Sequence, residues 1–143
     1  MIKDIFSKLS KLLLSLHQKG ISHRDLKSDN VIVKTDKQTS QVVDVRLIDF
    51  GFSFYIQSNE KFNKVCGTPN YMSPEIFNQE KICTQKTDIW SLGIILYKLV
   101  TNRYPFKHSR ENEKLKTNFD MNIFNGIEDS LKDLLVKILN TNP

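Results

Sequence analysis

The segment from Thr84 to Thr101 constrains the fold more than any other part of the chain. Its apolar residues surround the helix axis instead of keeping to one face: Ile89, Trp90, Leu92, Gly93, Ile94, Ile95, Leu96, Tyr97, Leu99 and Val100. A helix that is apolar nearly all round is buried inside a protein. We therefore expect this helix to run through the centre of a core, with Thr87 or Asp88 capping its start and Tyr104–Pro105–Phe106 marking its exit.

Two amphipathic helices are expected at the ends of the chain. Residues 1–19 place apolar side chains three and four positions apart, with lysines on the other face, and Gly20 is placed to cap the helix end. Helical spacing returns over residues 127–139, and a few residues at 76–77 can begin a short helix. The polar segment 108–125 is ambiguous, with room for one short helix.

A small β-hairpin is expected between these helices. The β-branched run Val31–Val33 and the segment Val43–Ile48 read as strands, and the polar stretch Lys34–Gln41 connects them. Residues 52–65 show no sustained period and read as a loop. Since a two-stranded ribbon is not stable alone in water, it must lie on the helical body. The sequence predicts one α+β domain over residues 1–143, mainly α-helical.

Composition excludes several classes of protein. A hydrophobic content of 39% argues against disorder, and no apolar run is long enough to span a bilayer, so no membrane partner is expected. Cys66 and Cys83 are too few for a disulfide scaffold, which favours a reducing, cytoplasmic location. The net charge of +5 is dispersed along the chain, so nucleic-acid binding is a weak alternative.

Two short motifs carry the chemistry. One is the run His23-Arg24-Asp25-Leu26-Lys27-Ser28-Asp29-Asn30, and the other is Asp49-Phe50-Gly51. The predicted hairpin brings Asn30 and Asp49 toward one point from neighbouring backbone segments. Taken singly, each motif is common in ordinary turns. Together, in this order, they put side chains that handle protons and Mg²⁺ at the spacing that phosphoryl transfer requires.

These residues resemble the C-terminal lobe of eukaryotic-type protein kinases, over essentially the full length of the chain. His23–Asp25 is similar to the catalytic loop and Asp49–Gly51 to the magnesium loop. Gly67–Glu75 is similar to the end of the activation segment, with Ser73 where alanine is usual. Asp88–Gly93 resembles the start of the family's central buried helix. The resemblance implies an ATP-dependent serine/threonine protein kinase, because Lys27 and Thr68 look like that branch of the family.

The resemblance also implies a role for each matching residue, with ATP and Mg²⁺ as cofactors and a protein carrying Ser or Thr as substrate. Asp25 would act on the proton of the substrate hydroxyl, and Lys27 would contact the transferred γ-phosphate. Asn30 and Asp49 would hold magnesium through their oxygen atoms. Thr68 would complete the catalytic set, and Ile32 would lie beneath the adenine. Further residues would have structural roles: His23 and Phe50 in a hydrophobic column anchored by Asp88, with Ile95 and Leu99 near the adenine.

Besides Ser73, the chain departs from the family pattern in three further respects. Lys64 stands where relatives often carry a phosphorylated Thr, so we expect no control by phosphorylation there, and Ser58 is the hydroxyl left upstream. The glycine-rich loop, strand lysine and helix glutamate of the N-terminal lobe are not among these 143 residues. The partner arginine of Glu75 would also lie beyond Pro143. We therefore expect a partial kinase domain.

Three functions stay open at this point. The first is a serine/threonine kinase whose domain extends beyond these residues. The second is a catalytically inactive, kinase-like module that binds or scaffolds partners, and the third is a basic helical nucleic-acid binder. The sequence does not indicate the kinase subfamily, the substrate sequence or the oligomeric state.

Overall fold

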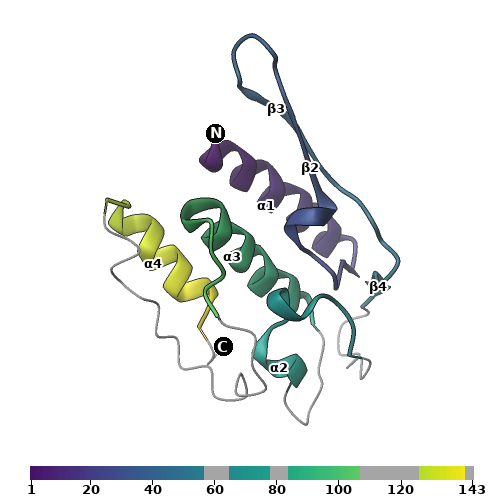
Figure 1. Ribbon diagram of the computed structural model, residues 1–143. Coiled ribbons are helices and arrows are strands. Elements are labelled where there is room, and N and C mark those ends of the chain that lie inside the picture. Colours follow the sequence, from purple (N-terminus) through teal and green to yellow (C-terminus); the bar gives the residue numbers. More distant parts are fainter. Residues whose placement is uncertain (57–64, 78–83, 107–125, 141–143) are drawn as a thin grey trace.

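The computed structural model describes residues 1–56, 65–77, 84–106 and 126–140. Helices and two small sheets make up this part of the chain (Figure 1). In chain order the elements are α1 (Ile2–Gln18), β1 (Ile21–Ser22), the 3-10 turn η1 (Ser28–Asn30), β2 (Val31–Thr35), β3 (Val42–Leu47), β4 (Phe54–Tyr55), the 3-10 turn η2 (Pro69–Tyr71), α2 (Pro74–Phe77), α3 (Gln85–Thr101) and α4 (Asp129–Ile138). The α+β class predicted from sequence is confirmed at this level.

Helix α3 is the centre of the core, as its sequence predicts. It lies between α1 and α4 in Figure 1, and it contacts both. Its residues from Trp90 to Tyr97 are all buried, and they pack with Leu9 and Leu13 of α1 and with Leu135 of α4. The apolar surface of α3 is thus covered from two sides, which is the arrangement that its sequence demands.

The predicted cap of α3 is wrong. The N-cap is Thr84, whose side chain accepts a hydrogen bond from the Lys86 amide at 3.2 Å, while the Thr87 hydroxyl accepts one from the Thr84 amide at 3.3 Å. Thr87 therefore completes a capping box from inside the first turn. Asp88 is fully buried and accepts hydrogen bonds from another segment, so it is not a cap. At the other end Asn102 takes a left-handed conformation, with φ 54°.

Helix α1 ends one residue before the predicted position. Lys19 is the C-terminal cap, and Gly20 follows at φ 73°, where its amide donates to the His17 carbonyl at 2.9 Å. A left-handed φ at this point suits glycine, which has no Cβ to clash. The turn leads the chain directly into β1 and the His23–Asn30 run.

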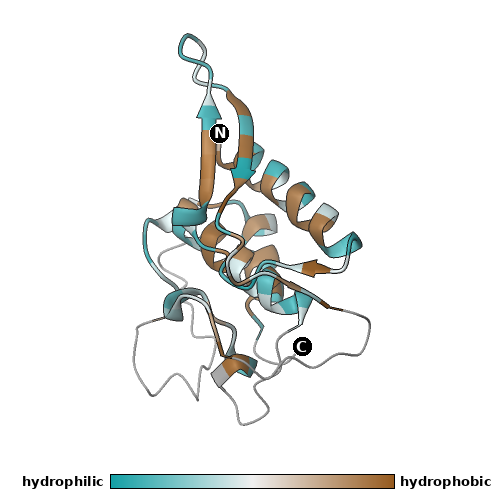
Figure 2. Cartoon of the chain, turned by 90° about the vertical axis from the view of Figure 1, so that its right-hand side faces the viewer, coloured by the Kyte–Doolittle hydropathy of each residue, from teal (hydrophilic) through white to brown (hydrophobic). Residues whose placement is uncertain are grey.

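Strands β2 and β3 form the predicted antiparallel hairpin, which projects from the helical body (Figure 2). Val31 pairs with Leu47, and the register shifts between Lys34 and Thr35. A second ribbon was not predicted: β1 pairs with β4, with Ile21 opposite Tyr55. Part of the expected 52–65 loop is therefore a strand. Each of these strands has only two residues, too few to show an alternating pattern.

The remaining predictions from sequence concern a short helix, segments that the structure does not describe, and membrane spans. The short helix expected near residues 76–77 is α2. The helix expected within 108–125 and the residues Ser58 and Lys64 fall outside the described residues. Among the helices that the structure describes, none is both long and apolar enough to cross a membrane.

Candidate active site

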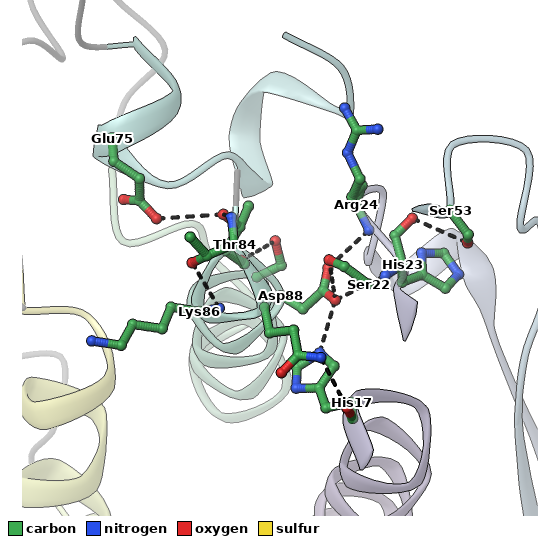
Figure 3. Close-up of polar contacts among 12 residues, drawn as sticks. His17, Ser22, His23, Arg24, Ser53, Glu75, Thr84, Lys86 and Asp88 are labelled. Atoms are coloured by element: carbon green, nitrogen blue, oxygen red, sulfur yellow. Dashed lines mark hydrogen bonds and ion pairs between the residues drawn. The ribbon is translucent and has the colours of Figure 1, made fainter. Parts of the chain in front are cut away.

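The candidate site is anchored by Asp88, whose buried carboxylate projects from α3 toward the segment that follows β1 (Figure 3). One carboxylate oxygen accepts a hydrogen bond from the Arg24 amide at 2.8 Å. The other accepts from the His23 amide and the Ser22 hydroxyl, both at 2.8 Å, and lies 2.9 Å from His17 Nε2. A carboxylate that accepts hydrogen bonds from backbone amides is a strong, charge-assisted anchor. Asp88 thus ties the start of the His23–Asn30 loop to the central helix.

This anchor holds the backbone in an uncommon conformation. Arg24 has φ 67°, in the left-handed region that residues other than glycine rarely adopt. The neighbouring His23 ring donates a hydrogen bond from Nε2 to the Ile48 carbonyl oxygen at 3.1 Å, and its ring centroid lies 5.0 Å from that of Phe50. The two motifs predicted from sequence are therefore in direct contact.

Three of the predicted site residues form a closed triangle. Thr68 Oγ1 donates to Asp25 Oδ1 at 2.7 Å, Lys27 Nζ lies 3.0 Å from Asp25 Oδ2, and Lys27 Nζ donates to Thr68 Oγ1 at 3.0 Å. The hydrogen bond to Asp25 raises the pKa of Lys27, an effect that burial opposes. Asp25 is almost fully buried, and both of its oxygens have partners. The triangle therefore fixes the orientation of the Asp25 carboxylate.

Gly67 explains how Thr68 reaches Asp25, although these residues are far apart in sequence. A Cβ at Gly67 would lie 2.7 Å from the Arg24 carbonyl oxygen, and Gly67 has φ 109°. Both the close approach and the positive φ require glycine. The backbone around Gly67 can thus pack closely against the loop that carries Asp25.

Asn30 and Asp49 lie on adjacent backbone segments, as predicted. The Ile48 amide donates to the Asn30 carbonyl at 3.0 Å, and Asp49 is the next residue, at φ 60°. The Asn30 side-chain amide donates to the Asp25 carbonyl oxygen at 2.9 Å. This leaves the Asn30 side-chain oxygen without a hydrogen bond in the described part of the chain, while Asp49 Oδ1 accepts only from the Gly51 amide at 3.2 Å.

These oxygens have the chemistry that Mg²⁺ requires. Magnesium prefers hard oxygen ligands, and it is usually held by one or two carboxylates together with substrate phosphates and water. No group of three or more His, Cys, Asp or Glu residues that could hold a metal occurs among the described residues. Asn30 and Asp49 would therefore form a partial ligand set. The Ile32 side chain on β2 is half exposed and so is open to a ligand.

Sequence reasoning missed a polar cluster beside the triangle. Tyr71 is only 3% exposed, and its hydroxyl lies 3.0 Å from Ser28 Oγ and 3.3 Å from Tyr104 Oη. Lys98 Nζ donates to Tyr104 Oη at 3.0 Å and to Tyr71 Oη at 3.4 Å. Three separate segments contribute to this cluster: η1, η2, and the end of α3 with the residues that follow it. No local spacing in the sequence could therefore have revealed the whole cluster. We call these residues, Ser28, Tyr71, Lys98 and Tyr104, the tyrosine cluster.

Comparison with known proteins agrees with this geometry. Residues 1–143 match the family model described as protein kinase domain. The chain belongs to the protein kinase family. Enzymes of this family transfer a phosphoryl group, and they generally use ATP with Mg²⁺. The resemblance inferred from the motifs is thereby confirmed.

Individual kinases align along nearly the whole chain. It is 33% identical over 150 residues to serine/threonine-protein kinase 33 of Bos taurus, covering 97% of this chain and 31% of that protein. It is 33% identical over 158 residues to the probable serine/threonine-protein kinase fhkD of Dictyostelium discoideum, and the alignment covers 99% of this chain and 21% of that protein. It is 32% identical over 152 residues to the phosphorylase b kinase gamma catalytic chain, liver/testis isoform, of Bos taurus, and the alignment covers 99% of this chain and 36% of that protein. The chain therefore spans about a third or less of these relatives' length.

Proposed function

We propose that residues 1–143 are the C-terminal lobe of a serine/threonine protein kinase domain, which transfers the ATP γ-phosphate to a Ser or Thr hydroxyl of a protein. One observation carries the proposal: the hydrogen-bonded triangle of Asp25, Lys27 and Thr68, with Asn30 bonded to the same loop. A purely structural role would not require the oriented carboxylate of Asp25 and the ammonium group of Lys27 to lie together, close to two further residues whose side-chain oxygens can bind a metal ion. The names of the aligned relatives support the serine/threonine class.

In this proposal the protein mainly positions the reactants and neutralises charge. Asp25 orients the substrate hydroxyl and accepts its proton. Lys27 and Thr68 hold the Asp25 carboxylate, and Lys27 presents its positive charge to the phosphoryl group in transit. Asn30 and Asp49 would hold the Mg²⁺ that accompanies ATP through their side-chain oxygens, and the ion would supply further charge neutralisation. Ile32 offers an apolar contact to the nucleotide base.

Binding and transfer are tested separately on the 143-residue chain. Thermal unfolding is followed with and without ATP and Mg²⁺, because a ligand that binds only the folded state adds stability by mass action, about 2.7 kcal/mol at a hundredfold excess over its dissociation constant. We expect a shift that Asp49→Asn removes and that Asp36→Asn, an exposed carboxylate in the β2–β3 turn, leaves unchanged.

Transfer is measured with radiolabelled ATP and a mixed protein substrate. We expect Asp25→Asn to reduce any transfer by about 10²- to 10⁴-fold, the usual contribution of a general base, while the thermal shift persists. Nucleotide binding without transfer in the unaltered chain would favour the kinase-like binding module instead. If neither a shift nor transfer is observed, the proposed activity does not belong to this chain.

A further inference from the structure

The tyrosine cluster places a positive charge beside the candidate active site, and this charge has no ion-pair partner in the described part of the chain. Lys98 Nζ is held by the hydroxyls of Tyr104 and Tyr71, and it lies 4.8 Å from the centroid of the Tyr104 ring. No carboxylate forms an ion pair with Lys98 among the residues that the structure describes. The interactions of Lys98 with neutral phenol groups leave its charge available to a ligand.

Two covalent connections place this cluster next to the reacting groups. Ser28, which contacts the Tyr71 hydroxyl, directly follows Lys27 of the triangle. Tyr71 lies one 3-10 turn after Thr68, and its amide donates to the Thr68 carbonyl at 2.9 Å. Because an extended peptide advances about 3.3 Å per residue, a substrate bound at Asp25 would reach the cluster within a few residues of its acceptor hydroxyl.

The protonation states of the cluster favour an anionic ligand. The Tyr104 hydrogen bond raises the pKa of Lys98, so the ammonium group stays charged at neutral pH. Burial raises the pKa of Tyr71, which keeps its hydroxyl protonated and able to donate. Tyr104 is 37% exposed, so the cluster can be reached from solvent. An ammonium group and phenol hydroxyls together suit a carboxylate, which accepts several hydrogen bonds.

We propose that Lys98, Tyr71 and Tyr104 form a subsite for an acidic side chain of the protein substrate, within a few residues of the hydroxyl that receives the phosphoryl group. This inference rests on the proposed function, since it concerns the substrate of the same site. It assigns to this chain a preference for Asp or Glu close to the acceptor residue. The net charge of +5 acts in the same direction, because it favours acidic partners in general.

One negative charge opposes this assignment. The carboxylate of Asp29 is exposed and close enough to Tyr104 to act on it electrostatically. Its effect on the pKa of Tyr104, which is to raise it, is smaller than the lowering effect of the Lys98 hydrogen bond. The positive charge therefore dominates at Tyr104, and Asp29 is expected to weaken the subsite without reversing it.

Peptide binding to the 143-residue chain, measured by fluorescence anisotropy without ATP, tests the subsite. Each labelled peptide carries one Ser in a neutral background, with a single Glu, Gln or Lys at one of the positions within three residues on either side. We expect a Glu peptide in at least one register to bind about tenfold more tightly than its Gln counterpart, the range for hydrogen bonds to a charged group. Added salt should reduce this preference.

Variants then assign the preference to Lys98. Lys98→Met keeps the aliphatic stem and should remove the preference for Glu, while Lys98→Glu should reverse it in favour of Lys. Lys86→Glu makes the same charge change at an exposed position of the same helix and should keep the preference. Asp29→Asn should increase it. Thermal unfolding of each variant verifies that it is folded, and if Lys98→Glu is unfolded then Lys98→Met decides.

Several outcomes would overturn the subsite. These are equal binding of Glu and Gln peptides in every register, tightest binding of a Lys peptide, absence of any Glu-peptide binding, or an equal loss of preference in Lys86→Glu. Because no ATP is present, the result is independent of transfer. A Glu preference that depends on Lys98 in a chain that transfers no phosphoryl group would keep the binding subsite and reject the proposed function.

Discussion

At the residue scale, Asp88 shows how one buried charge organises a site that lies far from it in sequence. Its two oxygens accept hydrogen bonds from the amides of His23 and Arg24 and from the Ser22 hydroxyl. Arg24 needs this support, because its left-handed φ of 67° is costly for a residue with a side chain. The same carboxylate therefore stabilises the fold and orients the loop that carries Asp25.

Replacing Asp88 with Asn should destabilise the protein strongly. An amide can offer an oxygen to only one side, so its NH₂ group must face either the Arg24 amide or the His23 amide, both of which are donors. An unsatisfied buried donor costs about 1–3 kcal/mol, and more where a charge is lost, so we expect a loss of about 2–4 kcal/mol in the free energy of unfolding. Urea denaturation measures this as a lower midpoint with an unchanged slope.

The matched control is Asp36→Asn. Asp36 also accepts hydrogen bonds from two backbone amides, those of Gln38 and Thr39, but it lies in the exposed turn between β2 and β3. Water can replace these interactions, so a much smaller loss is expected. Equal losses for the two variants would mean that the Asp88 network contributes no more to stability than a surface turn does.

At the element scale, the packing of α3 on α4 depends on a single glycine in the buried helix. A Cβ at Gly93 would lie 2.5 Å from Ile138 Cγ2 and 2.9 Å from Leu139 Cδ2. Carbon atoms in good contact are about 3.5–4.0 Å apart, so the two helices could not keep their present separation. Gly93 thus allows α4 to approach α3 closely.

We expect Gly93→Ala to lower the free energy of unfolding by about 1–2 kcal/mol. Alanine favours a helix by about 1 kcal/mol over glycine, whereas overpacking costs about 1–3 kcal/mol, and contacts this short place the overpacking cost at the upper end. In a double-mutant cycle by urea denaturation, Ile138→Ala should relieve part of the loss, with a coupling of about 1 kcal/mol. Gly93→Ala combined with Val136→Ala, an exposed position on α4, should be additive instead.

Much of this element structure was predictable from sequence, because its cause is local. The all-round apolar composition of residues 84–101 predicts a buried helix, and the β-branched runs around Lys34–Gln41 predict the hairpin. The cap of α3 was not predicted correctly, since Thr84, Thr87 and Asp88 are all suitable capping residues, and only the tertiary contacts of Asp88 exclude it. The pairing of β1 with β4 joins segments of two residues that have no recognisable pattern of their own.

The candidate site likewise has a part that was predictable from sequence and a part that was not. The positions of Asp25, Lys27, Asn30 and Asp49 were predictable, because the motifs that carry them are short and ordered along the chain. Thr68 was assigned to the catalytic set only through the family resemblance, and its hydrogen bond to Asp25 was not predicted. The tyrosine cluster was not foreseen, because Lys98 belongs to the helix whose sequence indicates nothing more than burial.

At the scale of the whole molecule, the described helices differ in how many other elements they contact. Helix α1 contacts β1, β3 and α3, and α3 contacts α1, α4 and the turn η2. The main contact of α4 within the described residues is with α3 alone, through Leu135 and Leu139, which are fully buried. The candidate active site is built on the elements that contact α1 and α3, and not on α4. Helix α3 supplies Asp88, and β2 and β3 flank Asn30 and Asp49.

We therefore expect α4 to open without the rest of the molecule. Local opening free energies follow the amount of buried apolar contact, so the amides of residues 133–138 in α4 should exchange with deuterium at least about tenfold faster than those of Leu92–Tyr97 in α3. Leu135→Ala should increase exchange in α4 further, because truncation of a buried leucine costs about 2–5 kcal/mol, while the protected amides of α1 keep their rates. Helix α1 is the suitable comparison, since it is also amphipathic and buries Leu9 and Leu13. If Leu135→Ala instead accelerates exchange equally in α1, α3 and α4, the three helices form one cooperative unit and the candidate site does not have a stable foundation independent of α4.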